Sequence, residues 1–271
     1  MTSLPYRLCA LDLDDTLLGP TQKISERNVA AVRAVADLGV SVVLASGRMH
    51  ESCVPYANQM GLETPIVSYN GAMVRLAHSE EMWRHLQVPG EAAAFVMDYC
   101  REKEMQLNYY RNNCVYSAAM THWIEVYQQR TNAPLKIRPD FYTALHGLPS
   151  TKLVIVNDPK IVQEIQPYFA QHFGESLYIT TTADEYLEFM LPTANKGAGL
   201  ALVAERLNIP LTETIAFGDS HNDIPMLKTA GLGVAVGNAK PELKAIAGRI
   251  AKPNTEDGVA QMLAEIFGVA V

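Results

Sequence analysis

Short apolar runs recur along the first and last parts of the chain, and they predict buried parallel strands. They lie at Leu8–Leu11, Val40–Ala45, Ile66–Ser68, Ile215–Phe217 and Gly233–Ala235. Helical spacing of apolar residues predicts helices at 25–38, 51–60, 196–207 and 258–267, the first with Ser25 as its N-cap and Gly39 as its stop. The alternation of strands and helices predicts an α/β fold with a doubly wound, Rossmann-like parallel sheet.

The middle of the chain, residues 82–190, has a different pattern. Helices are expected at 89–104, 121–129 and 159–173, and strands at 153–156 and in the stretches SLYITT and YLEFML. A hairpin is expected in QLNYY-RNN-CVYS, where a polar turn separates two strand-like runs. We interpret this region as an inserted α+β lobe, which leaves residues 1–81 and 191–271 as the core. The joints should be short, because no long Gly/Ser linker is visible.

Composition predicts a packed chain and limits its partners. Hydrophobic residues make up 48% and charged residues 19% of the 271 residues, which is ample material for a core. The formal net charge of -7 argues against a nucleic-acid groove, which needs a basic surface. It does not exclude a small anionic substrate, because one bound divalent ion and one lysine can dominate a pocket.

The cysteines and the N-terminus bear on the compartment. Cys9, Cys53, Cys100 and Cys114 are widely spaced and form no CxxC pair, so we interpret them as buried free thiols. The first residues, MTSLPYR, lack the apolar stretch of a signal peptide, and no run approaches the ~18 apolar residues of a membrane span. We therefore expect a cytoplasmic protein with no membrane partner.

Two carboxylates follow the first apolar run, in Asp12-Leu13-Asp14-Asp15-Thr16. Open α/β sheets bind ligands at strand ends, and residues i and i+2 of an extended segment face the same side, so Asp12 and Asp14 can converge. One carboxylate can attack phosphorus while the other protonates the leaving oxygen and later activates water. Crowded carboxylates also predict a bound cation. A surface Asx turn, the alternative, fits poorly with the strand that precedes the motif.

A second acidic motif, Gly218-Asp219-Ser220-His221-Asn222-Asp223, follows the apolar run TIAF. Asp219 and Asp223 lie four residues apart across a predicted strand-to-helix junction. That spacing suits one hard cation bound through oxygen, for which Mg²⁺ is the best candidate. Asp and Asn are also common N-cap residues, which would explain one of these positions but not all of them.

Two further segments carry groups that could bind phosphate. Ser46-Gly47-Arg48 follows the run VVLA, where a hydroxyl and backbone N–H groups can form a phosphate cradle, although a turn serine is an equal alternative. Lys196 begins a predicted helix, where a cation opposes the helix dipole and so favours a functional explanation. A single lysine is otherwise most often a solvated side chain.

These four clusters all follow segments of the same predicted sheet. Together they supply a nucleophile, an acid/base, a hydroxyl, a lysine and a metal site, which is the set that phosphoryl transfer needs. The sequence contains no HExxH, GxSxG or Walker motif that would favour another chemistry.

The motifs resemble those of the haloacid dehalogenase superfamily and, within it, the Cof-type sugar-phosphate phosphatases. The resemblance spans nearly the whole chain. It implies that Asp12 is phosphorylated, that Asp14 is the acid/base and that Lys196 is the catalytic lysine of the third motif. The implied metal ligands are Asp12, Asp14 through its backbone carbonyl, Asp219 and Asp223. The expected substrate- and phosphate-binding positions are Leu13, Ser46, Gly47, Arg48, Asn70 and Asn222. Asp15 departs from the frequent glycine of the family, which puts little in doubt.

The inserted lobe resembles the large α/β cap domain of this branch, which supplies most substrate contacts. Candidate contacts are Tyr109, Tyr110, Arg111, Tyr116, Trp123, Lys152 and Glu188, although aromatics in a small lobe more often form its core. The resemblance implies a Mg²⁺-dependent phosphatase of small phosphorylated metabolites, with sugar phosphates expected and phosphorylated vitamins or nucleotides still open. A phosphomannomutase-like phosphotransferase and an inactive binding module on the same fold are the alternatives. The sequence does not determine the oligomeric state.

Overall fold

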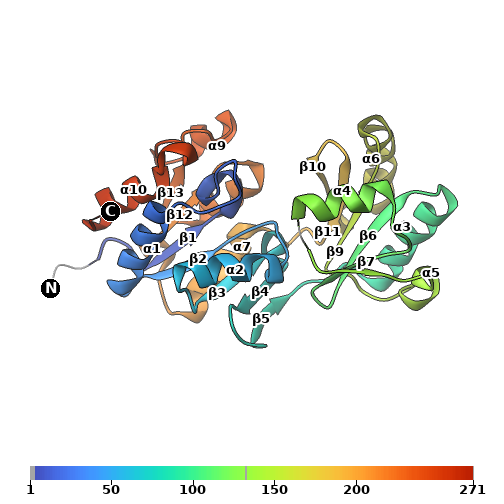
Figure 1. Cartoon of the computed structure of the whole chain (residues 1–271), viewed down its shortest axis with the longest axis horizontal. Coiled ribbons are helices and arrows are strands. Elements are labelled where there is room, and N and C mark those ends of the chain that lie inside the picture. The colour runs from blue at the N-terminus through green and yellow to red at the C-terminus, as the bar shows by residue number, and fades with distance from the viewer. Residues whose placement is uncertain (1–3, 132, 271) are drawn as a thin grey trace. The chain divides into compact units, whose positions relative to one another are not determined.

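The computed structural model describes residues 4–131 and 133–270, and the chain divides into two compact units (Figure 1). One, which we call the core unit, combines residues 1–84 and 195–271, and the other, the inserted unit, is residues 85–194. The inserted unit begins at 85, the last residue of strand β5 (Met82–His85), which neighbours β4 (Met73–Leu76) in a small sheet with β3 (Pro65–Ser68). It ends at 194, and Asn195 caps the first helix of the returning core segment.

A parallel sheet forms the centre of the core unit. Within the described residues it has five strands, in the spatial order β14 (Arg249–Ile250), β13 (Leu232–Ala235), β12 (Thr214–Gly218), β1 (Leu8–Leu11) and β2 (Ser41–Leu44). The middle strands β1 and β12 are buried at every position, as expected for strands covered on both faces. The predicted α/β class with a parallel sheet is therefore confirmed.

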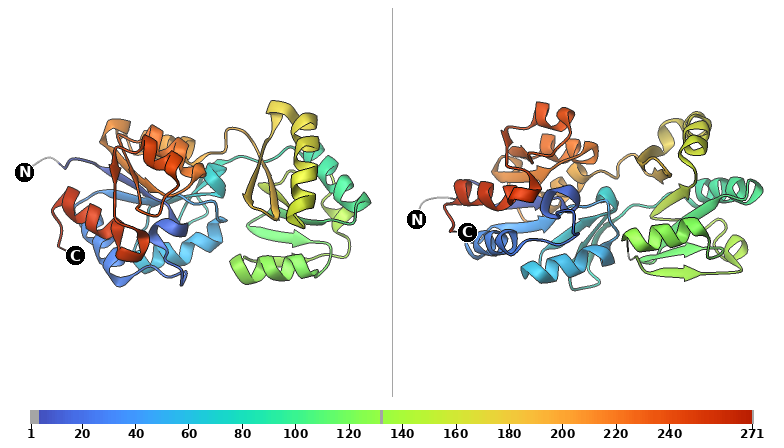
Figure 2. Two further views of the ribbon diagram at one scale, coloured as in Figure 1. Left: turned by 90° about the horizontal axis from the view of Figure 1, so that it is seen from above. Right: turned by 45° about the horizontal axis from the view of Figure 1, so that its top comes forward.

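Helices cover both faces of this sheet (Figures 1 and 2). One face carries α1 (Glu26–Asp37), α2 (His50–Met60) and α10 (Gly258–Phe267), and the other carries α7 (Lys196–Arg206), α8 (Ile224–Thr229) and α9 (Pro241–Ile246). Helix α1 begins as its sequence predicts, because the Ser25 hydroxyl accepts the backbone N–H of Asn28 at 3.1 Å. Gly39, the predicted stop, adopts φ +91°, which favours glycine.

The run predicted at Ile66–Ser68 does form a strand, β3 (Pro65–Ser68), but not within the five-stranded sheet. It pairs antiparallel with β4 (Met73–Leu76), and β5 follows β4 in the same small sheet. One parallel bridge, from Ala45 to Val67, joins β3 to the end of β2. The sequence pattern does not predict β4 and β5, because their short, partly polar runs resemble a loop.

The inserted unit is built on a sheet of its own. Its described residues form strands in the order β10 (Tyr178–Ala183), β11 (Tyr186–Met190), β9 (Lys152–Val156), β6 (Gln106–Arg111), β7 (Cys114–Ser117) and β8 (Leu135–Ile137). Its helices are α3 (Gly90–Glu102), α4 (His122–Thr131), α5 (Phe141–Ala144) and α6 (Pro159–Phe173). The predicted hairpin joins β6 to β7 through Asn112 and Asn113, whose positive φ angles asparagine tolerates. The sequence analysis does not predict β8 or α5, both of which are very short.

The strands of the inserted unit separate apolar from polar side chains. Leu107, Leu153 and Phe189 point into an apolar core with residues of α3 and α6. Lys152 and Glu188, at alternate positions, form a buried ion pair at 3.0 Å between Nζ and Oε1. Tyr109 and Tyr116 belong to the apolar core, as expected for aromatics in a small lobe.

The cysteines agree with the interpretation from the sequence. All four lie among the described residues, and each is buried and free. In the part of the chain that the structure describes, none of the helices combines the length and the apolar character needed to cross a membrane.

The position of Lys196, the first residue of α7, depends on how closely this helix packs. Two glycines permit a close approach. A Cβ atom at Gly197 would lie 2.5 Å from the carbonyl oxygen of Pro225 in α8, and one at Gly199 would lie 2.4 Å from Cγ1 of Val67 in β3. Larger residues at either position would therefore push α7, and Lys196 with it, away from the sheet.

We expect Gly197→Ala to lower the free energy of unfolding, because backbone atoms of α8 must move to admit the methyl group. Overpacking costs about 1–3 kcal/mol, and the higher helix propensity of alanine returns roughly 1 kcal/mol of this. Urea unfolding at neutral pH measures the difference. Gly19→Ala is the matched control, since no atom lies within 4 Å of its added Cβ. A Gly197→Ala variant more stable than Gly19→Ala would contradict the close packing of α7.

Candidate active site

The carboxylate of Asp12 lies at the carboxyl end of β1. Its backbone N–H donates to the carbonyl of Phe217 at 3.1 Å, and only 4% of the residue is exposed. The chain then forms one irregular helical turn, Leu13–Leu17, in which Asp14 is non-helical and Asp15 has φ 54°. The prediction of a continuous extended segment is therefore wrong, because the helical turn begins directly after Asp12.

The second acidic motif lies at the end of β12, the strand beside β1. Asp223 Oδ2 accepts the backbone N–H groups of Asp219 and Ser220, each at 3.0 Å. The side chain of Asp223 packs over Gly218, where a Cβ atom would lie only 2.5 Å from the Asp223 Cβ. On the other side, the hydroxyl of Thr16 donates to Asp219 Oδ1 at 3.3 Å. These contacts fix both carboxylates of the motif.

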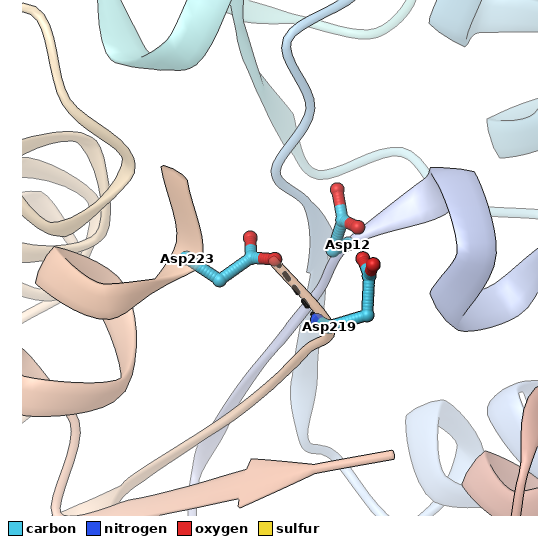
Figure 3. Close-up of side chains that lie close together, drawn as sticks. All are labelled: Asp12, Asp219 and Asp223. Carbon is cyan, nitrogen blue, oxygen red and sulfur yellow. Dashed lines mark hydrogen bonds between the residues drawn. The ribbon is translucent and has the colours of Figure 1, made fainter. Parts of the chain in front are cut away.

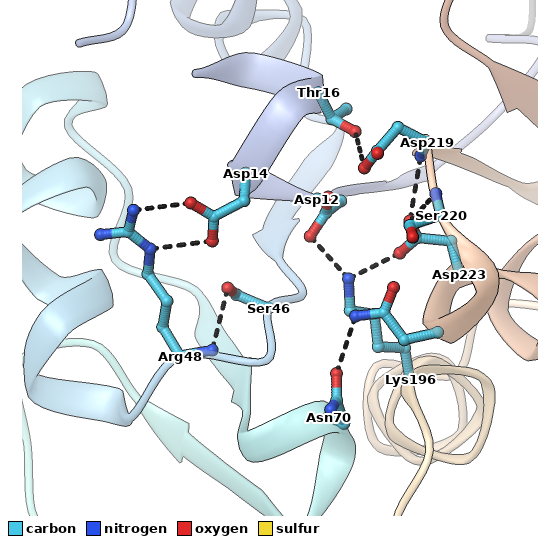
Figure 4. A network of polar contacts seen from close by, with 11 residues as sticks. Asp12, Asp14, Thr16, Ser46, Arg48, Asn70, Lys196, Asp219, Ser220 and Asp223 are labelled. Atoms are coloured by element: carbon cyan, nitrogen blue, oxygen red, sulfur yellow. Dashed lines mark hydrogen bonds and ion pairs between the residues drawn. The ribbon is translucent and has the colours of Figure 1, made fainter. Parts of the chain in front are cut away.

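Lys196 joins the two motifs. Its ammonium is fully buried and donates to Asp12 Oδ1 and to Asp223 Oδ1, both at 2.6 Å (Figure 4). Burial by itself lowers the pKa of Lys196, but the two carboxylates outweigh it, so its pKa is raised and the side chain is charged. These two bonds also explain why a cation stands at the N-terminus of α7, where the helix dipole opposes it.

The carboxylates of Asp12, Asp219 and Asp223 converge (Figure 3). One oxygen from each lies within 4.8 Å of the others, and no second group of this kind occurs among the described residues. Burial, followed by the charge of Asp223, raises the pKa of Asp219 to about 6. Burial, followed by the charge of Asp223, raises the pKa of Asp12 well above its ordinary value, against the opposing effect of Lys196.

This donor set fits a divalent cation. Three carboxylates against a single lysine leave an excess of negative charge in a largely buried volume. Hard cations such as Mg²⁺ and Ca²⁺ take oxygen ligands, and all three groups supply them. After burial, the charge of neighbouring carboxylates is the next cause of the raised pKa values of Asp12 and Asp219, and a bound cation would relieve that repulsion.

Ser46 and Asn70 lie beside the site just after the ends of β2 and β3 (Figure 4). Ser46 is fully buried, and its hydroxyl accepts the backbone N–H of Arg48 at 3.2 Å. The backbone N–H of Asn70 donates to the Ser46 carbonyl at 3.0 Å, and the side chain of Asn222 donates to Asn70 Oδ1 at 3.0 Å. A Cβ atom at Gly47 would lie 3.1 Å from Asn70 Oδ1, a tight contact that would require the Asn70 side chain to shift.

A strained turn holds Asn70 in place. Tyr69, Asn70 and Gly71 have φ angles of 50°, 53° and 90°. This conformation is rare for a bulky residue such as Tyr69. Gly71 also lies against the start of α7, since a Cβ atom there would be 2.2 Å from the carbonyl oxygen of Asn195. The turn thus ties Asn70 to the helix that carries Lys196.

Asp14 and Leu13 lie differently from the buried carboxylates. The Asp14 side chain is 45% exposed and pairs with Arg48, whose Nη2 lies 2.6 Å from Oδ1 (Figure 4). It is not a member of the carboxylate group around Asp12. Leu13, a predicted phosphate-binding position, has a buried side chain, and its carbonyl accepts the N–H of Leu18 at 2.8 Å.

Two residues of the site were not among the predicted positions. Thr16 ends the first acidic motif, and its hydroxyl positions Asp219. Ser220 forms a capping box with Asp223, and the spacing of a serine three residues before an acid could have indicated this.

The comparisons with known proteins agree with this geometry. The model of the haloacid dehalogenase-like hydrolase family matches residues 9–263. The chain belongs to this family. It is 31% identical, over 99% of its length and 100% of the relative's, to the 5-amino-6-(5-phospho-D-ribitylamino)uracil phosphatase YitU of Bacillus subtilis. The predicted class, a phosphatase of the haloacid dehalogenase superfamily, is thereby confirmed.

Solved structures of the family show the same fold. A haloacid dehalogenase-like hydrolase from Bacteroides thetaiotaomicron is 29% identical, with a TM-score of 0.90 over 97% of this chain and 100% of that one. A Thermotoga maritima protein is 27% identical, with a TM-score of 0.89 over 98% of each chain. Both alignments span the core unit and the inserted unit together, so the insertion is part of the shared architecture.

We expect Lys196→Met to destabilise the protein strongly, because it leaves the carboxylates of Asp12 and Asp223 buried without their cation. Breaking a buried pair costs about 3–5 kcal/mol. Urea unfolding in the presence of a chelator measures the loss, and Lys228→Met, at an exposed position of α8, is the control. A loss below about 1 kcal/mol would show that the Lys196 contacts do not form in solution.

Proposed function

We propose that this enzyme is a Mg²⁺-dependent phosphatase of small phosphorylated metabolites that works through an aspartyl-phosphate on Asp12. The observation that carries the proposal is the contact of Lys196 with Asp12. A buried ammonium at 2.6 Å from a carboxylate at a strand end orients that carboxylate and offers positive charge to an incoming phosphate.

In the first step, a carboxylate oxygen of Asp12 forms a bond to phosphorus as the bond between phosphorus and the ester oxygen breaks. The electron pair of that bond goes to the leaving oxygen, which takes a proton from the carboxylic acid of Asp14. In the second step, the Asp14 carboxylate removes a proton from water, whose oxygen attacks phosphorus. The bond to Asp12 then breaks, which releases inorganic phosphate and restores both side chains.

The position of Asp14 supports this division of labour. An attacking oxygen lies about 3 Å from phosphorus, and the leaving oxygen with its proton donor adds several ångströms on the opposite side. The acid must therefore stand apart from the nucleophile rather than beside it. Asp14 does so, because it is half-exposed and outside the buried carboxylate group.

The remaining groups have supporting roles in the proposal. Asp12, Asp219 and Asp223 would hold the Mg²⁺ ion, with the backbone carbonyl of Asp14 as a further ligand. The ion, when bound, supplies charge neutralisation for the phosphoryl group. Ser46, with the backbone of Gly47 and the amides of Asn70 and Asn222, would bind phosphate oxygens.

We propose that the inserted unit is the cap domain that selects the substrate, and that the substrates are sugar phosphates or similar polyhydroxylated phosphate esters. The name of the Bacillus subtilis relative, which acts on a phosphoribityl compound, supports this class. A phosphomannomutase-like activity is less well supported, because it needs additional cap cations. Arg101 and Arg138 pair with nearby aspartates, and Arg111 donates to the carbonyl of Pro149.

Asp12→Asn is expected to lower turnover on the order of 10⁴-fold or more at saturating Mg²⁺, because an amide cannot form the acyl phosphate. Asp14→Asn is expected to behave differently. With 4-nitrophenyl phosphate it still phosphorylates Asp12, but hydrolysis of the intermediate stalls. Quenching followed by peptide mass mapping locates the phosphate. Phosphate on a serine or histidine, or full turnover by Asp12→Asn, would refute the mechanism.

Asp219→Asn is expected to raise the Mg²⁺ concentration needed for half-maximal activity by about tenfold or more, since altering metal-site groups costs at least this much affinity. Titration of activity with Mg²⁺ measures it. Asp15→Asn is the control, because Asp15 is exposed and its left-handed φ of 54° suits asparagine. An unchanged Mg²⁺ requirement in Asp219→Asn would remove Asp219 from the metal site.

A further inference from the structure

The guanidinium of Arg48 lies at the centre of a polar cluster beside the site (Figure 4). Its Nε donates to Asp14 Oδ2 at 2.9 Å and its Nη2 to Asp14 Oδ1 at 2.6 Å. The same Nη2 donates to the side-chain carbonyl of Gln22. Nη1 donates to the hydroxyl of Tyr56 at 3.3 Å, and the guanidinium lies 5.4 Å from the centre of the Tyr56 ring.

These contacts leave little of Arg48 for a phosphate. A guanidinium has five N–H donors, and partners among the described residues occupy four of them. An arginine that binds phosphate bidentately presents a pair of parallel N–H groups to it. In Arg48 the Nε and Nη2 pair is turned to Asp14 instead.

The cluster also holds Arg48 itself in place. Tyr56 belongs to α2 and Gln22 to the loop after the helical turn Leu13–Leu17, and the hydroxyl of Tyr56 donates to the Gln22 carbonyl at 3.3 Å. Only 19% of the Arg48 side chain is exposed. Segments that lie far apart in the sequence therefore fix the guanidinium before any substrate binds.

The fixed guanidinium restricts the orientation of the Asp14 carboxylate and still leaves acceptor sites on its oxygens. The Asp14 side chain is 45% exposed, so without a partner it would move among several rotamers. The two parallel hydrogen bonds set both its direction and its plane. Each carboxylate oxygen has two acceptor sites, and Arg48 uses one site on each, so one remains on each oxygen for a proton or a water molecule.

We propose that Arg48 is a positioning residue that holds Asp14 where it exchanges protons with the leaving oxygen and with water. This inference rests on the proposed aspartyl-phosphate mechanism. It assigns Arg48 a role different from the phosphate contact expected from the sequence. Arg48 does not touch the substrate and acts through Asp14 alone.

The consequence is a dependence on the leaving group. When the bond between phosphorus and oxygen breaks, an alkoxide needs the proton of Asp14, whereas a nitrophenolate leaves without it. The ratio kcat/KM reports the steps up to the first irreversible one, which is release of the alcohol. Misplacing Asp14 therefore lowers kcat/KM for an alkyl phosphate and spares it for an activated aryl phosphate.

The test compares Arg48→Met and Arg48→Lys with the parent enzyme on glycerol phosphate and on 4-nitrophenyl phosphate, with Mg²⁺ saturating. Arg48→Met is expected to lower kcat/KM on the order of 10²-fold for the alkyl ester, the usual size of a general-acid effect, and less than about tenfold for the aryl ester. Arg48→Lys is expected to lose less kcat/KM on the alkyl ester than Arg48→Met does. Its ammonium keeps the positive charge beside Asp14, although it cannot form the two parallel hydrogen bonds of the guanidinium.

Arg75→Met is the matched control. Arg75 is also nearly buried and also pairs with carboxylates, but these belong to Glu51 and Glu80, neither of which is part of the site. It is expected to affect both substrates equally, as a purely structural change does. Thermal unfolding of each variant identifies misfolding. If Arg48→Met does not fold, the selective loss in Arg48→Lys decides the matter.

A double-mutant cycle gives the decisive comparison. In an Asp14→Asn background, Arg48→Met is expected to change kcat/KM for the alkyl phosphate less than about twofold, because its only route of action is gone. A further loss as large as in the parent, or equal losses on both esters with weaker inhibition by inorganic phosphate, would overturn the inference. Turnover by Asp12→Asn would instead overturn the proposed mechanism, so the two failures are distinguishable.

Discussion

The active site depends on one buried cluster of charges, the ammonium of Lys196 between Asp12 and Asp223. Moving ions out of water costs several kcal/mol each, and this cost is offset only when their geometry and hydrogen bonds are good. The end of β1, the start of α8 and the start of α7 must therefore arrive within hydrogen-bond distance of one another. The glycines that face α7 and those within it make this approach possible, because a side chain at Gly71 or Gly197 would strike backbone atoms.

The cluster has more negative than positive charge, and this imbalance connects the fold to its chemistry. Asp223 also has a structural role beside its place in the carboxylate group, since one of its oxygens accepts two backbone N–H groups and the other accepts Lys196. Asp12 and Asp219 then face each other across a volume that favours a cation. The crowded carboxylates repel one another in the folded protein, and a bound divalent ion would relieve this repulsion and stabilise the fold. The packing at the sheet edge that brings the carboxylates together therefore also favours the ion.

The two acids of the first motif differ because their surroundings differ. Asp12 is buried beside Lys196, which suits a nucleophile held in one orientation. Asp14, two residues later, is half-exposed and bound by Arg48. The helical turn that begins at Leu13 causes the separation, because it rotates Asp14 out of the direction that an extended chain would give it. Similar divisions of labour between two carboxylates are set by environment in other enzymes.

The sequence by itself determined most of the elements and the edge of the sheet at which the acidic residues gather. Apolar runs bounded by acids and glycines locate β1, β2 and β12, because strands buried on both faces are apolar at successive positions. The periodicity of α6 and α10 gives their bounds, because a helix buried on one face repeats its apolar residues at helical spacing. The short strands β4, β5 and β8 leave no such pattern, because each is too short or too polar to differ from a loop.

Only the tertiary structure decided which charged groups meet. Nothing in the sequence says that Lys196 contacts Asp12 across 184 positions, or that Arg48 pairs with Asp14. Gln22 and Tyr56 belong to none of the sequence motifs, yet both accept hydrogen bonds from Arg48. Periodicity reports which face of an element is buried, but the partner of a polar side chain depends on distances between elements, which close packing sets only once the chain has folded.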